Sequence, residues 1–298
     1  MILKSSGGFE ARDPSIVFFE GKYYHCYSTS EALFVAVGET LQDLCTAKPT
    51  LVYTPEQGKE YSKELWAPEL HIINGKCYIY VACDDGNNKN HRMYVLTNDS
   101  SDPTLTYRLF GKLSDSTNKW AIDGTVFEYG NELYTVWSGW EGDVNVCQNL
   151  YIAKMSNPST ISSERVMIST PEYDWEKKNC DGVHLPFINE GPFCFEKNGE
   201  LMIFYSASGS WANNYCIGLL RFKNGDLLDK NNWVKQSFPA LCNADGWNGP
   251  GHCTVFSANE TDYIAFHNYD EGKTKGWDNV HAIIKPFILK NGKITFCD

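Results

Sequence analysis

Short runs in which apolar and polar residues alternate recur along the whole chain, and this two-residue period is typical of half-buried β-strands. Five of these runs share one pattern: an apolar strand, a turn containing Gly or Asn, and a second strand rich in aromatic and β-branched residues. This pattern predicts a β-hairpin. The five copies read RDPSIVFFEGKYYHCYS, WAPELHIINGKCYIYVA, IDGTVFEYGNELYTVWSG, NEGPFCFEKNGELMIFYSA and GPGHCTVFSANETDYIAFHN.

The copies recur at a nearly constant spacing, and short strand-like runs such as LFVAVG and RMYVLTN follow each hairpin. Aligned on Pro14, Pro68, Gly124, Pro192 and Pro250, they lie 54, 56, 68 and 58 residues apart. Small sheets repeated at such a period bury both faces only by packing around an axis. We therefore predict an all-β fold, a five-bladed β-propeller formed by residues 1–298 as a single domain.

The same pattern also bears on the alternative fold and on the helix content. A pair of β-sandwich domains is the alternative fold, and the absence of a linker or of a shift in composition disfavours it. Long helices are not expected. The segment 159–178 contains Pro and β-branched residues, so we interpret it as an excursion between blades rather than a helix.

The composition narrows the class of ligand. The 298 residues are 42% hydrophobic and 14% aromatic, which suffices for a large core. The formal net charge of −11, without a cluster of Lys or Arg, argues against nucleic acid and favours a neutral ligand. The chain has no run of 18 apolar residues and no signal peptide at its N-terminus, so neither a membrane span nor a membrane partner is expected.

Eleven cysteines are spread singly along the chain, with no CxxC pair and no Cys/His spacing typical of zinc. Cys26, Cys77 and Cys194 lie in apolar strand-like runs, where cysteine behaves as a small buried hydrophobe. We therefore expect free thiols, no disulfide and a cytoplasmic location.

Acidic residues stand at the start of three of the five hairpins. In a propeller the innermost strand of each blade begins near the central axis, so the residues just before these strands converge on one cavity. These residues are Asp13, Ala67, Asp123, Glu190 and the segment 249–252. Gathering like charges is costly unless a site uses them. Glycoside hydrolysis uses one carboxylic acid to protonate the leaving oxygen and one carboxylate to activate water or attack the sugar, and a third acid raises the proton affinity of the first.

Nine tryptophans also suit a sugar ligand, because the apolar face of a sugar ring stacks on an aromatic ring. Trp66 directly precedes Ala67, so we predict that it lies beside the sugar. The tryptophans expected in the core or at the rim are Trp137, Trp140, Trp211 and Trp247.

The segments ARDPSIVFFEGKYY, WAPELHIINGKCYIY, AIDGTVF, NEGPF and GPGH, in this order, resemble glycoside hydrolase family 43 over the whole chain. The resemblance implies a five-bladed propeller in which Asp13 is the general base, Asp123 tunes and orients, and Glu190 is the general acid. His252 matches a histidine at the channel axis, where it binds substrate or lies near a calcium or a water cluster. A single histidine is a poor calcium ligand, so the calcium stays open, and the reaction itself requires no cofactor.

The resemblance favours an exo-acting α-L-arabinofuranosidase on arabinan or arabinoxylan oligosaccharides. A β-D-xylosidase of the same family and a non-catalytic sugar-binding propeller are the alternatives. Relatives carry a sugar-contacting Arg in the last blades, whereas here no Arg follows Arg221. Asp13 and Glu190 begin the first and fourth repeats, so we expect a separation of about 6.5 to 9.5 Å between their carboxyl groups and inversion at the anomeric carbon.

Overall fold

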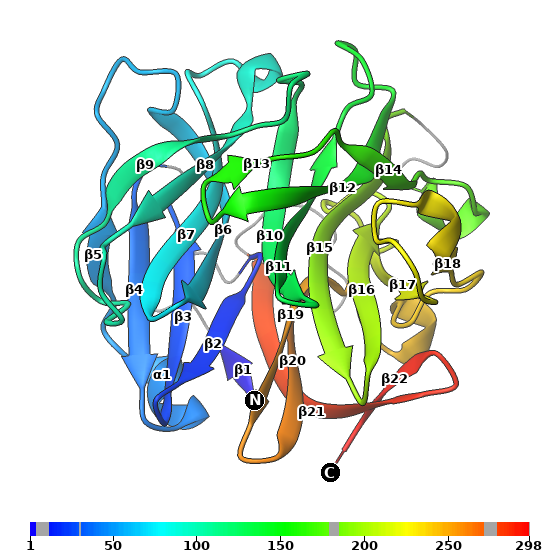
Figure 1. Cartoon of the computed structure of the whole chain (residues 1–298). Coiled ribbons are helices and arrows are strands. Elements are labelled where there is room, and N and C mark those ends of the chain that lie inside the picture. Colours follow the sequence, from blue (N-terminus) through cyan, green and yellow to red (C-terminus); the bar gives the residue numbers. More distant parts are fainter. Residues whose placement is uncertain (4–11, 30, 179–184, 271–278, 298) are drawn as a thin grey trace.

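The computed structural model describes residues 1–3, 12–29, 31–178, 185–270 and 279–297. Within these ranges the chain is almost entirely β-structure, with one short helix, α1 (Leu41–Thr46), and four 3-10 turns. The turns are η1 (Asn88–Asn90), η2 (Asp174–Glu176), η3 (Lys230–Asn232) and η4 (Asn243–Asp245). The all-β prediction is confirmed (Figure 1).

The first two repeats each form a four-stranded antiparallel sheet in which the strands follow chain order. The strands of the first sheet are β2 (Ser15–Phe19), β3 (Lys22–Ser28), β4 (Leu33–Gly38) and β5 (Thr50–Tyr53). Those of the second are β6 (Lys63–Ile73), β7 (Lys76–Asp84), β8 (Arg92–Thr97) and β9 (Arg108–Leu113). Each begins with a predicted hairpin, because the Gly/Asn turns close the first two strands.

The third and fourth repeats are hydrogen-bonded into one nine-stranded sheet. Its strands are β10 (Ala121–Tyr129), β11 (Glu132–Gly139), β12 (Cys147–Asn157), β13 (Thr160–Ile161), β14 (Val166–Ser169), β15 (Phe187–Lys197), β16 (Glu200–Ala207), β17 (Cys216–Phe222) and β18 (Trp233–Lys235). Only a short parallel ladder between β12 and β15 joins the two repeats; all other pairings are antiparallel. The predicted excursion 159–178 contributes β13, β14 and η2, so it is partly β-structure that completes the third repeat.

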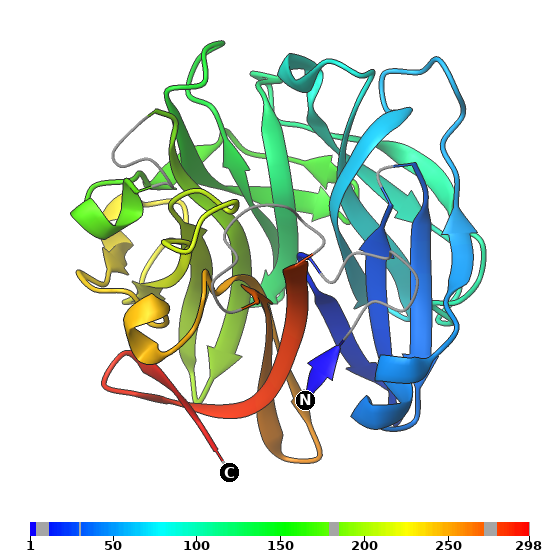
Figure 2. The same ribbon diagram turned by 180° about the vertical axis from the view of Figure 1, so that it is seen from behind.

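The last sheet contains both ends of the chain. It consists of β19 (Gly251–Ala258), β20 (Thr261–Tyr269), β21 (Val280–Lys290), β22 (Lys293–Phe296) and the N-terminal strand β1 (Ile2–Leu3). β1 pairs antiparallel with β21, with Ile2 opposite Ile283 (Figure 2). The first residues of the chain therefore lie against the last repeat.

The described core consists of five apolar clusters, and each lies between two successive repeats. One cluster, for example, joins Val35 of the first repeat to Ile79 of the second. The fifth cluster packs Ile16 and Tyr23 of the first repeat against Phe256 and Ile284 of the last. Each sheet thus buries apolar side chains against both neighbours, and the last repeat is a neighbour of the first.

The innermost strand of each repeat carries a left-handed residue near its start. The φ angles are 47° at Asp13, 43° at Ala67, 55° at Asp123, 51° at Gly191 and 45° at His252. In the last four cases the pairing with the next strand shifts register there, which is the mark of a β-bulge. Left-handed backbone costs a non-glycine residue about 1 to 3 kcal/mol and is concentrated at functional sites.

These bulges correct two details of the sequence alignment. Within the predicted segment 249–252 the equivalent residue is His252, two positions after the aligned Pro250, because the bulge and not the proline marks the common point. Asp123 and Glu190 lie within β10 and β15 rather than in front of them, because each of these strands begins to pair with its neighbour before the bulge.

Candidate active site

One pocket of about 630 Å³ opens where the innermost strands begin. All of the predicted site residues line it, namely Asp13, Trp66, Asp123, Glu190 and His252. They come from all five repeats, so the prediction that the starts of the repeats converge on a common cavity is confirmed.

Glu190 is buried, and the hydroxyl of Tyr215 donates a hydrogen bond of 2.8 Å to its Oε1. Burial raises the pKa of Glu190 to about 8, and the neighbouring charge of Asp123 adds to the effect. Tyr215 reaches this position because residue 251 is glycine: a Cβ there would lie 2.0 Å from its ring. The carboxyl group of Glu190 therefore holds a proton at neutral pH.

Asp123 lies beside Glu190, and the backbone N–H of Gly191 donates a 3.0 Å hydrogen bond to its Oδ2. Burial raises the pKa of Asp123 to about 6, with a further contribution from the charge of Asp13, while the charge of His252 opposes the rise. The predicted effect of Asp123 on Glu190 is present in direction, but burial is the larger cause of the high pKa of Glu190.

Asp13 has the opposite electrostatic environment. Its Oδ1 lies 3.1 Å from Nδ1 of His252 and 3.4 Å from Nδ1 of His267. Burial works against ionisation of Asp13, but the two histidines and Arg12 outweigh it and hold its pKa below the usual range. Burial likewise disfavours the charged form of His252, yet the carboxyl groups of Asp13, Asp123 and Glu190 outweigh it and raise its pKa. Asp13 is therefore an ionised carboxylate held against a cationic partner.

The contacts of His252 do not fit direct ligation of calcium. Its Nδ1 faces Asp13, its backbone N–H donates to Oγ of Ser206 at 2.6 Å, and calcium takes oxygen ligands. Among the residues that the structure describes, no group of three or more His, Cys, Asp and Glu side chains is arranged to hold a metal ion. No step of the chemistry below is assigned to a metal.

Three tryptophans, Trp66, Trp120 and Trp211, are among the residues that line the pocket. Trp66 stacks on His91 with the ring centroids 4.0 Å apart, and its Nε1 donates to Oε2 of Glu64 at 2.9 Å. His91 is fully buried, with its Nδ1 2.9 Å from Oδ2 of Asp84. Trp66 is therefore held in place from behind while it lines the cavity.

The other tryptophans divide as the sequence suggested. Trp137 and Trp140 are buried, and Trp247 packs edge-on against Phe266. Trp211 lines the pocket and keeps 41% of its surface exposed, which is the rim position.

Sequence reasoning missed four residues of the site: Arg12, Trp120, Tyr215 and His267. Arg12 and Trp120 line the pocket. Arg12, Trp66 and Glu190 each directly precede the left-handed residue of their repeat, so a stricter alignment would have found Arg12. Tyr215 and His267 lie outside the aligned starts of the repeats, and no local pattern marks them.

One pocket thus holds a protonated carboxylic acid, an ionised carboxylate, a third acid and three tryptophan side chains. A glycoside hydrolase uses two carboxyl groups of this kind, one protonated and one ionised, as its acid and its base.

The model of the family Glycosyl hydrolases family 43 matches residues 8–294. The chain belongs to this family, as the resemblance of its five motifs predicted.

Individual relatives of the chain support its membership of this family. The chain is 31% identical to the extracellular exo-alpha-(1->5)-L-arabinofuranosidase of Streptomyces chartreusis, over 83% of this chain and 76% of the relative. It is 32% identical to the enzyme of the same name from Streptomyces avermitilis, over 86% of this chain, and spans only 54% of that longer protein. The crystal structure of an alpha-L-arabinofuranosidase from Lactobacillus brevis superposes with a TM-score of 0.86 at 32% identity, covering 97% of this chain and 94% of the other.

The predicted cytoplasmic location is wrong, because both Streptomyces relatives are named extracellular enzymes. The prediction of a cytoplasmic location came from the single, scattered cysteines, and the structure shows why these say little about the compartment. The ten cysteines that it describes are free, and five of them are buried, so these five serve as small core residues whatever the compartment. Cys180 lies outside the described residues. None of the described helices has the length and apolar character needed to cross a membrane.

Proposed function

We propose that this chain is an inverting, exo-acting α-L-arabinofuranosidase that removes arabinose from arabinan or arabinoxylan oligosaccharides. The observation that carries the proposal is that two carboxyl groups in one pocket differ in protonation state. Glu190 is a proton donor near neutral pH, and Asp13 is an ionised acceptor. The names of the relatives support the choice of sugar and of exo action. The net charge of −11 argues against nucleic acid or an anionic membrane as a partner.

We further propose that residues 1–298 form one catalytic unit, in which the five repeats are the five blades of a propeller. Five apolar clusters between successive repeats support this arrangement, as does the contact between the last repeat and the first. Asp13 belongs to the first blade and Glu190 to the fourth, so the two carboxyl groups approach the sugar from different sides.

The reaction follows from these positions. Glu190 donates its proton to the glycosidic oxygen as the bond to the anomeric carbon breaks. Asp13 accepts a proton from a water molecule that attacks the opposite face of the sugar, which inverts the configuration. Asp123 disfavours ionisation of Glu190 and accepts a hydrogen bond from Gly191, which orients the strand beside the acid. These proton transfers require no cofactor.

Four residues are assigned to substrate binding and positioning. Trp66 offers its ring face to the sugar, and Arg12 supplies donors to sugar hydroxyls in place of the arginine that the last blades lack. His252 lines the pocket and positions Asp13 through the ion pair between its Nδ1 and Oδ1 of Asp13. Trp211, half-exposed at the rim, receives the leaving sugar.

The test compares the release of an aryl group from an aryl α-L-arabinofuranoside and from an aryl β-D-xylopyranoside. We expect turnover of the arabinofuranoside that is lost in Asp13→Asn and Glu190→Gln. Preference for the xylopyranoside would make the chain a β-D-xylosidase. Binding of arabino-oligosaccharides without turnover of either substrate would show a non-catalytic sugar-binding propeller.

A further inference from the structure

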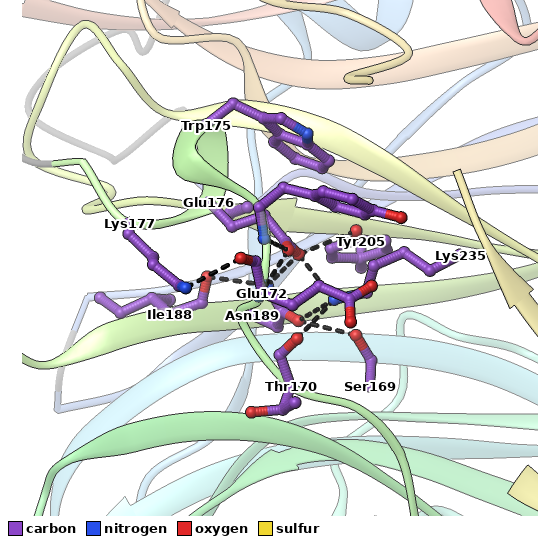
Figure 3. Close-up of polar contacts among 12 residues, drawn as sticks. Ser169, Thr170, Glu172, Trp175, Glu176, Lys177, Ile188, Asn189, Tyr205 and Lys235 are labelled. Atoms are coloured by element: carbon purple, nitrogen blue, oxygen red, sulfur yellow. Dashed lines mark hydrogen bonds and ion pairs between the residues drawn. The ribbon is translucent and has the colours of Figure 1, made fainter. Parts of the chain in front are cut away.

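A second buried group of charged and polar side chains surrounds Glu176 and includes Asn189, the residue before Glu190 (Figure 3). At its centre is Glu176 of η2, which is fully buried. Its Oε1 accepts hydrogen bonds from Lys235 Nζ at 2.8 Å, Asn189 Nδ2 at 2.9 Å and the Tyr205 hydroxyl at 3.0 Å. Its Oε2 accepts from the backbone N–H groups of residues 172 and 173 at 2.8 and 2.9 Å. Five donors therefore fix one carboxylate.

The ammonium group of Lys235, at the end of β18, is likewise surrounded by hydrogen-bond partners. Besides Glu176, its Nζ contacts the carbonyl oxygen of Thr170 at 2.5 Å and Oδ1 of Asn189 at 3.2 Å. An ammonium group has three protons, and three oxygen acceptors surround this one. Only 9% of the Lys235 side chain is exposed, so the pair is an interior ion pair and not a surface contact.

The network ends on Asn189, the residue before Glu190. Asn189 donates to Glu176, and its Oδ1 accepts from Lys235 and from the Ser169 hydroxyl, the latter at 2.7 Å. Its backbone oxygen accepts from the hydroxyl of Ser138 at 2.9 Å. Because successive side chains of a strand point to opposite faces, this side chain is anchored on the face away from the pocket while Glu190 points into it.

This anchor stands next to an irregular part of the sheet. β15 pairs regularly with β16 at Asn189 and Glu190, then shifts register before Phe193, and the parallel ladder to β12 ends at Ile188. Glu190 is therefore the last regularly paired residue before the bulge. The contacts of the Asn189 side chain add support from outside the ladder at this point.

Building on the proposed function, we propose that the Glu176–Lys235 ion pair acts through Asn189 to position the proton donor Glu190. Glu176, Lys235 and Asn189 are positioning residues: they touch neither substrate nor the reacting atoms. Their effect on the position of the acid matters for the rate, because a displacement of about 1 Å at a reacting group costs about a hundredfold.

A purely structural role is the competing explanation, since the same contacts also tie the segment 159–178 to β15 and β18. The two explanations differ in what they predict for Glu190. A structural role changes only the stability of the fold. Positioning changes the pKa of Glu190 and kcat, because a loosened acid becomes hydrated and loses the burial that raises its pKa.

The direct test is Asn189→Ala, which removes the link and leaves the ion pair intact. We expect kcat on an aryl α-L-arabinofuranoside to fall about 10- to 100-fold, with KM changed less than about threefold. The basic limb of the pH–rate profile should move down by about one pH unit. The matched control is Lys197→Met, which breaks an exposed pair with Asp262 at the far end of the same strand and should change none of these values.

Removing Lys235 alone would leave the buried charge of Glu176 without its cation, and that loss by itself destabilises the fold. The double variant Lys235→Met/Glu176→Gln avoids this, because replacing both charges of a buried pair is often neutral for stability. We expect it to reproduce the effects of Asn189→Ala. The combination of all three changes should be clearly less than additive, since they act through one link.

A readout without substrate separates this proposal from the assignment of function. The pKa of Glu190 can be followed by 13C NMR of labelled glutamate carboxyl groups, with Glu190→Gln identifying its signal. A lowered pKa in Asn189→Ala supports positioning even if neither aryl glycoside is turned over, an outcome that would refute the proposed activity alone. The proposal would be overturned if Asn189→Ala lowers thermal stability but leaves the pKa of Glu190 unchanged and kcat within about twofold of the parent.

Discussion

Replacing Tyr215 by phenylalanine removes a hydroxyl that donates a hydrogen bond to Glu190 and also contacts the side chain of Ser206. The hydroxyl of Tyr215 donates to Oε1 of Glu190 at 2.8 Å, and the ring stacks on His267 at 5.1 Å between centroids. Phenylalanine keeps the ring and the stacking partner. Because the hydrogen bond favours the ionised form of Glu190, its loss should raise the pKa of Glu190 above its value of about 8.

The size of the shift follows from the difference between two hydrogen bonds. A hydrogen bond to a charged group contributes about 1.5 to 3 kcal/mol and one to a neutral group about 1 kcal/mol. The ionised form of Glu190 therefore loses about 0.5 to 2 kcal/mol more than the protonated form. At 1.36 kcal/mol per pKa unit this equals an upward shift of about 0.4 to 1.5 units.

The assay is the pH dependence of kcat/KM on an aryl α-L-arabinofuranoside, whose basic limb reports the general acid of the free enzyme. Tyr215→Phe should move this limb to higher pH. Tyr80→Phe is the matched control, because it removes a buried hydroxyl that donates to the carbonyl of Pro158, outside the residues that line the pocket, and should leave the limb in place. An unchanged or lowered limb in Tyr215→Phe would refute the assignment of Glu190 as the acid that Tyr215 contacts.

Three further predictions concern the same pocket. Asp13→Asn and Glu190→Gln should each lower kcat by about 10²- to 10⁴-fold, and NMR of the first-formed sugar should show inversion; a retained configuration would contradict the single displacement. Asp123→Asn should move the basic limb to lower pH, opposite to Tyr215→Phe, because it removes a negative charge that raises the pKa of Glu190; pH–rate profiles of the two variants compared directly decide this. Trp66→Ala should raise KM for arabino-oligosaccharides about tenfold or more, as loss of a stacking platform does, and equal KM values in variant and parent would remove Trp66 from the sugar site.

The pattern of the chain contained most of the fold because the repeat is a local property. Hairpin turns and strand alternation act over a few residues, and the same signals recur five times. The same alignment identified Asp13, Asp123 and Glu190, since each is or directly precedes the left-handed residue that opens its repeat. It placed the fifth equivalent point only within the segment 249–252, because a left-handed bulge at His252 leaves no unique residue pattern.

Other parts of the site were beyond any local signal. Tyr215 contacts Glu190 over 25 positions of sequence, and Lys235 approaches Glu176 over 59. Such pairs are created by the packing of strands from different parts of the chain. The segment 159–178 is similar: its composition did not reveal that Glu176 would be fully enclosed by β15, β16 and β18.

The sequence by itself determined that this chain folds into repeated antiparallel units and that three acids begin three of them. It did so because strand and turn preferences depend on neighbouring residues. The family resemblance implied which acid carries the proton, but the physical cause of the difference lies in the tertiary structure. Glu190 and Asp13 are both carboxyl groups in the same pocket, yet burial beside Asp123 raises the pKa of one, and two histidines lower the pKa of the other. The division of roles between chemically similar side chains arises from desolvation and from charges brought close in space, and these exist only in the folded chain.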